Sequence, residues 1–242
     1  MSFLTVEGLC KSFGGLKAIN NLDFHVEEGE IVGIIGPNGS GKTTSLNLLT
    51  GFLKPNTGKI TFRGQDITGL PRHRICQKGI ARTFQLSKPF LDFTALQNVM
   101  VGRAYGQEPS ENMKTAAIES MDILELVGLK SNAEILVKDL TVMDRKRLEL
   151  ARALATRPAM LLLDELLAGL NLAEADDACK LIKRIRDSKI AIIMVEHIVK
   201  AVTCVSDRII VLNMGEKIAE GSPEEMIHHP KVIEVYLGKS HA

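Results

Sequence analysis

The sequence contains the stretch Gly36-Pro37-Asn38-Gly39-Ser40-Gly41-Lys42-Thr43, which matches the phosphate-binding pattern G-x-x-x-x-G-K-[ST] at every fixed position. The short, largely apolar run 30–35 before it predicts a buried strand. Leucines at helical spacing after Thr44 predict a helix. An ordinary turn between a strand and a helix needs neither the lysine nor the second glycine at this spacing. The stretch therefore predicts that the chain binds a nucleoside triphosphate.

Each residue type in this loop suits the binding of phosphate. Glycines let the backbone turn tightly and aim successive N–H groups at phosphate oxygens. The helix N-terminus adds partial positive charge, and Lys42 brings a full charge to the β- and γ-phosphates. The Thr43 hydroxyl is predicted to bind Mg²⁺. We expect the nucleotide to be held by Gly36, Pro37, Asn38, Gly39, Ser40, Gly41, Lys42, Thr43 and Thr44.

The composition is that of an ordinary globular protein. The chain has 242 residues, 45% of them hydrophobic and 24% charged, with a net charge of +1. This balance argues against broad binding of nucleic acid or of anionic membranes. No apolar run is long enough to span a membrane, and the start of the sequence lacks a signal-peptide pattern, so we expect a cytoplasmic protein. The cysteines form no C-x-x-C pair and predict reduced thiols: Cys10, Cys76, Cys179 and Cys204.

Patterning divides the chain into an α/β part and a helical part. Alternation predicts strands at 3–9 and 22–26, joined by a loop at 11–15, and a further strand at 59–62. A helical piece at 71–78 leads to a strand at 80–84. From about residue 86 to 156 helical segments follow one another, which predicts a helical lobe inserted into a single domain spanning 1–242. Strands at 160–165 and 190–195, a helix at 173–187, a hairpin at 208–220 and short terminal helices complete the prediction.

Polar residues follow the predicted core strands. Asp164 and Glu165 end an apolar run downstream of the phosphate loop, where one carboxylate can hold Mg²⁺ and the next can polarise the attacking water. Gln85 ends its strand and could reach the metal or the water. His197, after another apolar strand, could contact the γ-phosphate. Phe13 could stack on the base or pack in the core.

These pieces, in this order, resemble the ATP-binding subunit of ABC transporters over almost the whole chain. The phrases 81–85 and 168–171 and the ending 235–238 are similar to the subunits that drive uptake of branched-chain amino acids. The resemblance implies that Phe13 stacks on adenine, that Gln85 belongs to the magnesium-sensing loop and that Glu165 and His197 are catalytic. It implies binding of ATP and Mg²⁺, with Thr43, Gln85 and Asp164 at the metal. It also implies a homodimer or heterodimer of ATPase subunits that encloses two ATP molecules. The partners implied are membrane permeases on the inner face of the plasma membrane and, indirectly, a substrate-binding protein.

The sequence departs from that family at the phrase that contacts the partner's ATP. The family has Leu-Ser-Gly-Gly-Gln where this chain has 140–144, so a hydroxyl remains at Thr141, both glycines are absent and Asp144 replaces glutamine. We expect Thr141 to contact the nucleotide. We also expect Asp144 to turn back to the backbone N–H of Thr141 as a capping box, with Arg145, Lys146 and Arg147 in the next turn offsetting its charge. Leu166 and Asn171 replace the family's usual proline and aspartate.

Other classes share this ATPase core. DNA-repair relatives carry a long coiled coil, and ribosome-associated relatives carry two cores in one chain; this chain has neither sustained heptads nor a second phosphate loop. The ATPase of a lipopolysaccharide-type exporter and a regulatory subunit with weak hydrolysis stay open as alternatives. Because this subunit does not contact the transported molecule, the sequence does not identify the substrate.

Overall fold

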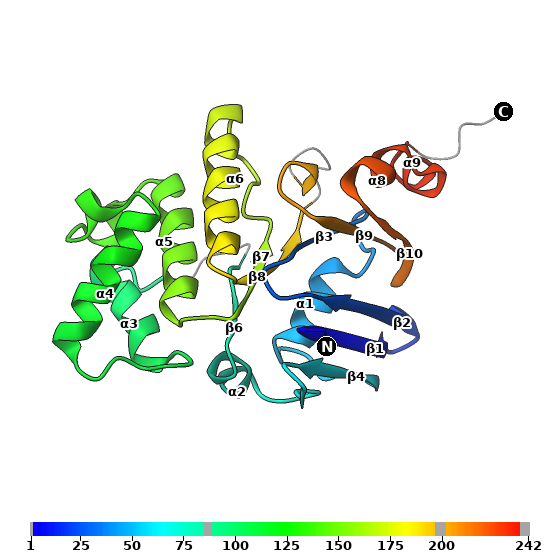
Figure 1. Cartoon of the computed structure of the whole chain (residues 1–242), viewed down its shortest axis with the longest axis horizontal. Coiled ribbons are helices and arrows are strands. Elements are labelled where there is room, and N and C mark those ends of the chain that lie inside the picture. The colour runs from blue at the N-terminus through cyan, green and yellow to red at the C-terminus, as the bar shows by residue number, and fades with distance from the viewer. Residues whose placement is uncertain (1, 85–88, 197–201, 238–242) are drawn as a thin grey trace. The chain divides into compact units, whose positions relative to one another are not determined.

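A computed structural model describes residues 2–84, 89–196 and 202–237, and Figure 1 shows its ribbon. The chain forms two compact units. The core unit comprises Met1–Arg72 and Leu162–Ala242, and the helical unit comprises His73–Leu161. The range 86–156, predicted as the helical lobe, lies inside the second unit. Among the described residues, no helix is both long and apolar enough to cross a membrane.

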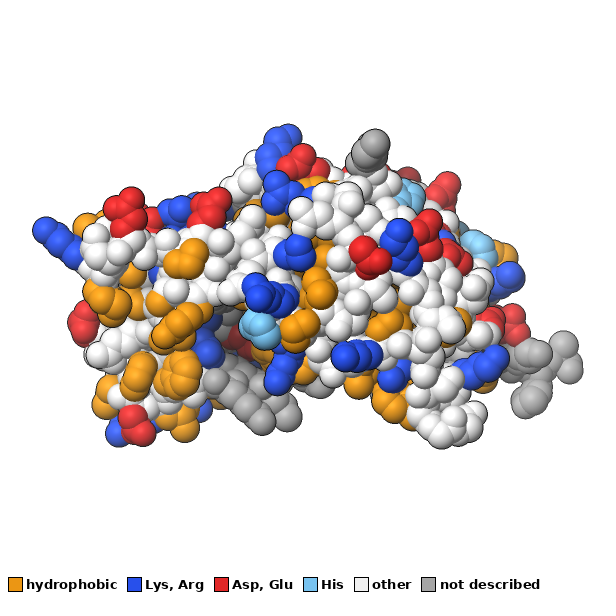
Figure 2. Space-filling view, turned by 90° about the horizontal axis from the view of Figure 1, so that it is seen from below, with side chains coloured by type: hydrophobic (Ala, Val, Ile, Leu, Met, Phe, Trp, Pro, Cys, Tyr) orange, Lys and Arg blue, Asp and Glu red, His pale blue; other side chains and the backbone are white. Residues whose placement is uncertain are grey.

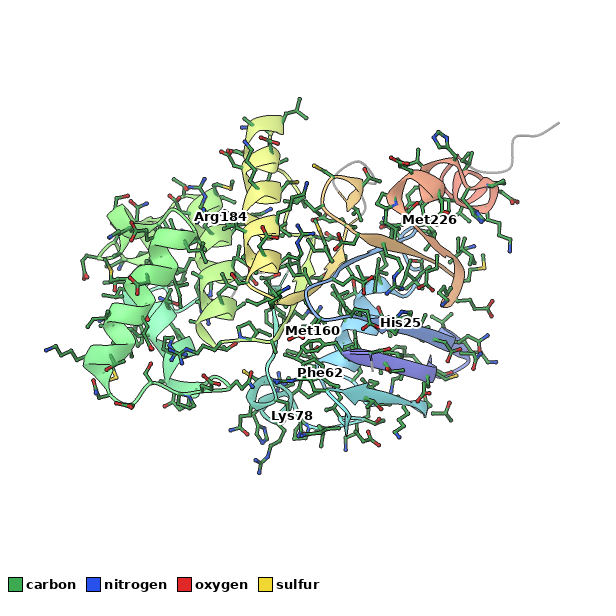
Figure 3. All side chains as sticks on the ribbon, in the orientation of Figure 1. His25, Phe62, Lys78, Met160, Arg184 and Met226 are labelled. Atoms are coloured by element: carbon green, nitrogen blue, oxygen red, sulfur yellow. The ribbon has the colours of Figure 1, made fainter. Side chains whose placement is uncertain are left out.

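An antiparallel sheet opens the core unit. Its strand order is β2-β1-β4-β5, with β1 at Leu4–Phe13, β2 at Leu16–Val26, β4 at Thr57–Phe62 and β5 at Gln65–Asp66. The buried ring of Phe62, labelled in Figure 3, lies edge-on to Phe3 at 5.0 Å. The prediction of a loop at 11–15 is wrong, because β1 continues to Phe13 and the turn is confined to Gly14 and Gly15.

The second sheet has six strands in the order β10-β9-β3-β8-β7-β6. Its strands are β3 (Ile31–Ile35), β6 (Ile80–Arg82), β7 (Met160–Asp164), β8 (Ala191–Val195), β9 (Arg208–Asn213) and β10 (Glu216–Gly221). Strand β3 runs parallel to β8 and β9, and β10 returns antiparallel to β9. Every residue of β3, β7 and β8 is buried, which explains their continuous apolar runs.

Helices complete both units. They are α1 (Lys42–Leu49), α2 (Arg72–Gln77), α3 (Ala95–Tyr105), α4 (Met113–Leu126), α5 (Val142–Ala155), α6 (Leu172–Asp187), α8 (Pro223–His228) and α9 (Pro230–Leu237). In the helical unit, α3, α4 and α5 pack together, as the green helices of Figure 1 show. The fully buried Arg103 of α3 connects them: its Nε donates to Glu119 of α4 at 2.8 Å and its Nη1 to the carbonyl of Ala155 at 3.0 Å. The predicted α/β fold, with an N-terminal antiparallel sheet and a helical part, is confirmed.

Candidate functional site

The phosphate-loop pattern forms the connection from β3 to α1. Gly41 is the N-cap of α1 with φ +106, and a Cβ there would lie 2.7 Å from the carbonyl oxygen of Ala18. Only glycine suits that conformation and that approach. The loop thus leads directly into the N-terminus of α1, where the first N–H groups have no partner within the helix. The predicted strand–loop–helix order is present.

Lys42 lies folded back on this loop. Its side chain is buried, and Nζ donates to the carbonyl of Gly36 at 2.8 Å and to that of Pro37 at 3.0 Å. Burial lowers the pKa of the ammonium, whereas the nearby carboxylates of Glu165 and Asp164 raise it. The structure therefore brings the lysine and both carboxylates together within the core unit.

The loop also carries polar groups suited to an anion. The Ser40 hydroxyl is buried and has no hydrogen-bond partner in the described part of the chain. A Cβ built on Gly39 meets nothing within 4 Å, so the space beside the loop at that point is open. A buried polar atom without a partner costs about 1–3 kcal/mol, which a bound anion can offset. Thr43 is exposed in the first turn of α1.

The carboxylates occupy the C-terminal end of β7. Asp164 is buried, while the following Glu165 adopts a left-handed backbone with φ +50 and donates its N–H to the carbonyl of Val195 at 2.9 Å. A non-glycine residue in this region is uncommon and stores backbone strain that the surrounding structure must hold. Strain at this position is typical of a functional site.

Glu196 helps to hold this turn, a role that the sequence did not reveal. The residue is fully buried, and its carboxylate accepts the N–H of Leu167 at 2.7 Å. The end of β8 thus holds the backbone on both sides of Leu166. In the sequence, Glu196 is a glutamate directly after an apolar strand, and no motif distinguishes it.

Three other predicted residues have different outcomes. Phe13 is an exposed residue at the end of β1, with the Lys11 ammonium 5.3 Å from its ring centre. A core role for Phe13 is therefore wrong, and its ring is open to a ligand. Gln85 and His197 lie outside the described residues. The residue before Gln85, Phe84, donates its N–H to the carboxylate of Glu149 on α5.

The capping box predicted at the altered phrase forms only in part. Thr141 is the N-cap of α5, and its hydroxyl accepts the N–H of Asp144 at 3.1 Å. The Asp144 carboxylate accepts the Thr141 hydroxyl proton at 2.8 Å rather than the backbone N–H that we expected. It also accepts from Asn132 at 3.4 Å and lies 3.9 Å from a guanidinium nitrogen of Arg147.

Of the cations expected near Asp144, Arg147 is in place and Arg145 is not. Arg145 donates instead to the carbonyls of Val137 at 3.1 Å and Lys138 at 2.7 Å. Arg147, one helical turn further along α5, lies close enough to Asp144 to offset part of its charge. Asn171 is committed to a complete capping box with Glu174 at the start of α6.

An apolar patch covers part of the helical unit. Phe90, Leu91 and Phe93 are 44%, 49% and 44% exposed, and the two phenylalanine rings lie 5.3 Å apart. Phe93 is therefore not packed in the interior of the helical unit. Figure 2 shows apolar side chains gathered over the helical unit. An exposed cluster of aromatic rings is typical of a surface that contacts another protein.

Comparison with known proteins places these features in one family. The family model described as ABC transporter matches residues 19–168, and the model described as branched-chain amino acid ATP-binding cassette transporter matches residues 216–242. The chain is similar to the high-affinity branched-chain amino acid transport ATP-binding protein BraF of Pseudomonas aeruginosa, with 40% identity over 98% of both chains. It is also 40% identical to the protein LivG of Escherichia coli, described in the same words, again over 98% of both.

Solved structures give the same result. The ADP conformation of MJ1267, an ATP-binding cassette of an ABC transporter, superposes with a TM-score of 0.90 at 32% identity. The superposition covers 99% of this chain and 100% of that one. A dimeric structure of the cassette MJ0796 is 24% identical with a TM-score of 0.83, and supports the fold alone.

Proposed function

The chain belongs to the ATP-binding subunits of ABC transporters, and from this premise we propose that it powers the uptake of branched-chain or other hydrophobic amino acids. The observation that carries the proposal is the 40% identity to the branched-chain transport protein over 98% of both chains. The match of residues 216–242 to the branched-chain model supports the same branch of the family. The exporter and the regulatory subunit have no comparable support.

Lys42, Asp164 and Glu165 would carry the ATPase chemistry. Lys42 would exchange the carbonyls of Gly36 and Pro37 for oxygens of the β- and γ-phosphates, which compensate its buried charge better than neutral carbonyls do. Glu165 would polarise the attacking water, and the strained turn at φ +50 would aim its carboxylate. We propose the remaining loop residues, from Asn38 to Thr44, as phosphate ligands through their N–H groups and hydroxyls.

A magnesium ion fits the same place. Asp164, buried at the end of β7, and the hydroxyl of Thr43 would hold it, with Gln85 as a further ligand. These are oxygen donors, and Mg²⁺ in such sites is bound by one or two carboxylates together with substrate phosphates. When bound, the ion neutralises charge that develops on the phosphate oxygens.

Other residues would act around the nucleotide. Phe13, exposed at the end of β1, would stack on adenine, and His197 would contact the γ-phosphate. Thr141 would act across a dimer, where the N-terminus of α5 would face the ATP of a second ATPase subunit. The subunit would be a single ABC ATPase domain with a helical insertion at 86–156. It would attach to permeases at the inner face of the plasma membrane through the patch of Phe90 and Leu91.

The substitution Glu165→Gln tests this function. It keeps the size of the side chain but removes the base, so ATP should bind and remain uncleaved, and ATP should then produce dimers in gel filtration. The control is Glu174→Gln, which changes the same group in the first turn of α6. Turnover of ATP by Glu165→Gln at the wild-type rate would show that Glu165 is not the catalytic carboxylate.

A further inference from the structure

A tyrosine of the last helix lies against the start of the phosphate loop. Tyr236 of α9 packs on a buried cluster that includes Ile35, the last residue of β3 and the neighbour of Gly36. The same cluster contains Met226 of α8, labelled in Figure 3, and Val232 of α9. The C-terminal helices therefore share a buried apolar cluster with the strand that leads into the loop.

The hydroxyl of Tyr236 is buried and lacks a regular hydrogen bond. Its oxygen has no partner in the described part of the chain, although it faces the backbone N–H of Gly36. Burial raises the pKa of the phenol, and the Gly36 N–H opposes part of that rise. The two groups are thus a matched donor and acceptor that make no hydrogen bond in this structure. A phenol can both donate and accept, so a small movement of the Gly36 peptide would complete the bond.

Gly36 is also the residue that Lys42 holds. Its carbonyl accepts from Lys42 Nζ at 2.8 Å. A Cβ on Gly36 would lie 2.2 Å from the carbonyl oxygen of Leu212, so the backbone at this point is closely packed. When the ammonium turns to phosphate, this carbonyl loses its donor, which removes one restraint on the adjoining peptide.

We propose that Tyr236 is a positioning residue for the phosphate loop, which accepts the Gly36 N–H when nucleotide is bound. The C-terminal helices then contribute to nucleotide affinity without touching the nucleotide. This role belongs to the region 216–242 that matches the branched-chain model, not to the region 19–168 that matches the general one. The inference rests on the proposed binding of nucleotide at Lys42.

The test compares the two tyrosines of the chain. Tyr236→Phe removes only the hydroxyl and should raise the Kd for ADP about fivefold, the value of one net hydrogen bond. Tyr105→Phe makes the same change at a side chain that is 76% exposed on α3, and should leave the Kd unchanged. Both are measured by calorimetry on the full chain, with thermal unfolding as a check on folding.

A spectroscopic measurement separates positioning from a purely structural role. The chain has two tyrosines and no tryptophan, so in Tyr105→Phe the tyrosine fluorescence comes from Tyr236 alone. Addition of ADP should change that emission, with the double variant Tyr105→Phe, Tyr236→Phe as the blank. A Kd for Tyr236→Phe within twofold of wild type, or an emission that ADP leaves unchanged, would overturn the inference. Failure of the wild-type protein to bind ADP would overturn the proposed function with it.

Discussion

The substitution Asp144→Asn tests the role of the carboxylate in the altered phrase at 140–144. The carboxylate is 17% exposed, accepts the Thr141 hydroxyl at 2.8 Å and lies 3.9 Å from Arg147. Asparagine keeps an oxygen that can accept from Thr141, but it loses the negative charge. Two interactions are therefore weakened: the attraction to Arg147 and the attraction to the N-terminus of α5.

The magnitude of each is small. A charge in the first turn of a helix contributes about 0.3–1 kcal/mol, and a partly exposed ion pair about 0.2–1 kcal/mol. Asp144→Asn should thus lower the free energy of unfolding by at most about 2 kcal/mol. Because Thr141, Asn132 and Arg147 already engage the carboxylate, we expect its charge to have little effect on a nucleotide bound across a dimer. The ATPase rate should change by less than about fivefold, which is roughly 1 kcal/mol of barrier.

The assay is steady-state hydrolysis of magnesium ATP together with thermal unfolding. Asp122→Asn, an exposed acid on α4, serves as the matched control. Thr141→Ala should be more harmful than Asp144→Asn, because it removes a cap of about 1 kcal/mol and leaves the carboxylate without its closest side-chain donor. Thr141→Ser should restore most of the loss. A tenfold rise in activity or in ATP-induced dimerisation of Asp144→Asn would refute this reasoning, since it would identify the acid as a brake on closure.

Three further predictions concern other parts of the chain. Lys42→Ala should abolish ATP binding measured by calorimetry while the protein stays folded, because it removes the full positive charge of the loop; an unchanged Kd would contradict the assignment. The double variant Phe90→Asp, Leu91→Asp should leave its membrane complex without loss of ATP binding. The control Ile118→Asp, at another exposed apolar side chain of the helical unit, should stay in the complex. Retention of the double variant in the membrane fraction would show that the docking site lies elsewhere. Arg103→Ala should lower the free energy of unfolding by about 3 kcal/mol in urea titrations, because it breaks a buried charge-assisted contact with α4, and a loss below about 1 kcal/mol would show that solvent satisfies the groups left behind.

The elements around the phosphate loop were predictable because their signals are local. The run at 31–35 is apolar throughout since β3 is buried on both faces, and the pattern from Gly36 to Thr43 has few solutions other than a strand, a loop and a helix. The same reasoning located β7 and the carboxylates that follow it. In each case residues that are adjacent in the sequence are sufficient to predict the element.

The first strand shows where periodicity fails. Its pairing with β2 shifts register between Val6 and Leu9, between Leu9 and Lys11, and between Lys11 and Ser12. The first shift adds a residue on β1 and the other two add one on β2, so a prediction that depends on period two in β1 stops at the first break. The strand nevertheless continues to Phe13, because the backbone hydrogen bonds resume after each shift. Its exposed end then places the Phe13 ring at the surface instead of in a loop.

Side-chain hydrogen-bond partners, unlike strands and helices, are not determined by the local sequence. The Asp144 carboxylate could accept a hydrogen bond from either the N–H or the hydroxyl of Thr141. It accepts from the hydroxyl, in a position where Asn132 and Arg147 also approach it. Neither of those two belongs to the capping pattern. Tyr236 is an extreme case, since the peptide that it faces lies at Gly36, almost the whole chain away. Its hydroxyl matters because the core packing of α9 brings it there, and a motif records only residues that are close in sequence. A residue that positions a loop from a distant element therefore has to be identified in the structure. A buried polar atom without a hydrogen-bond partner can identify it, whereas a sequence motif cannot.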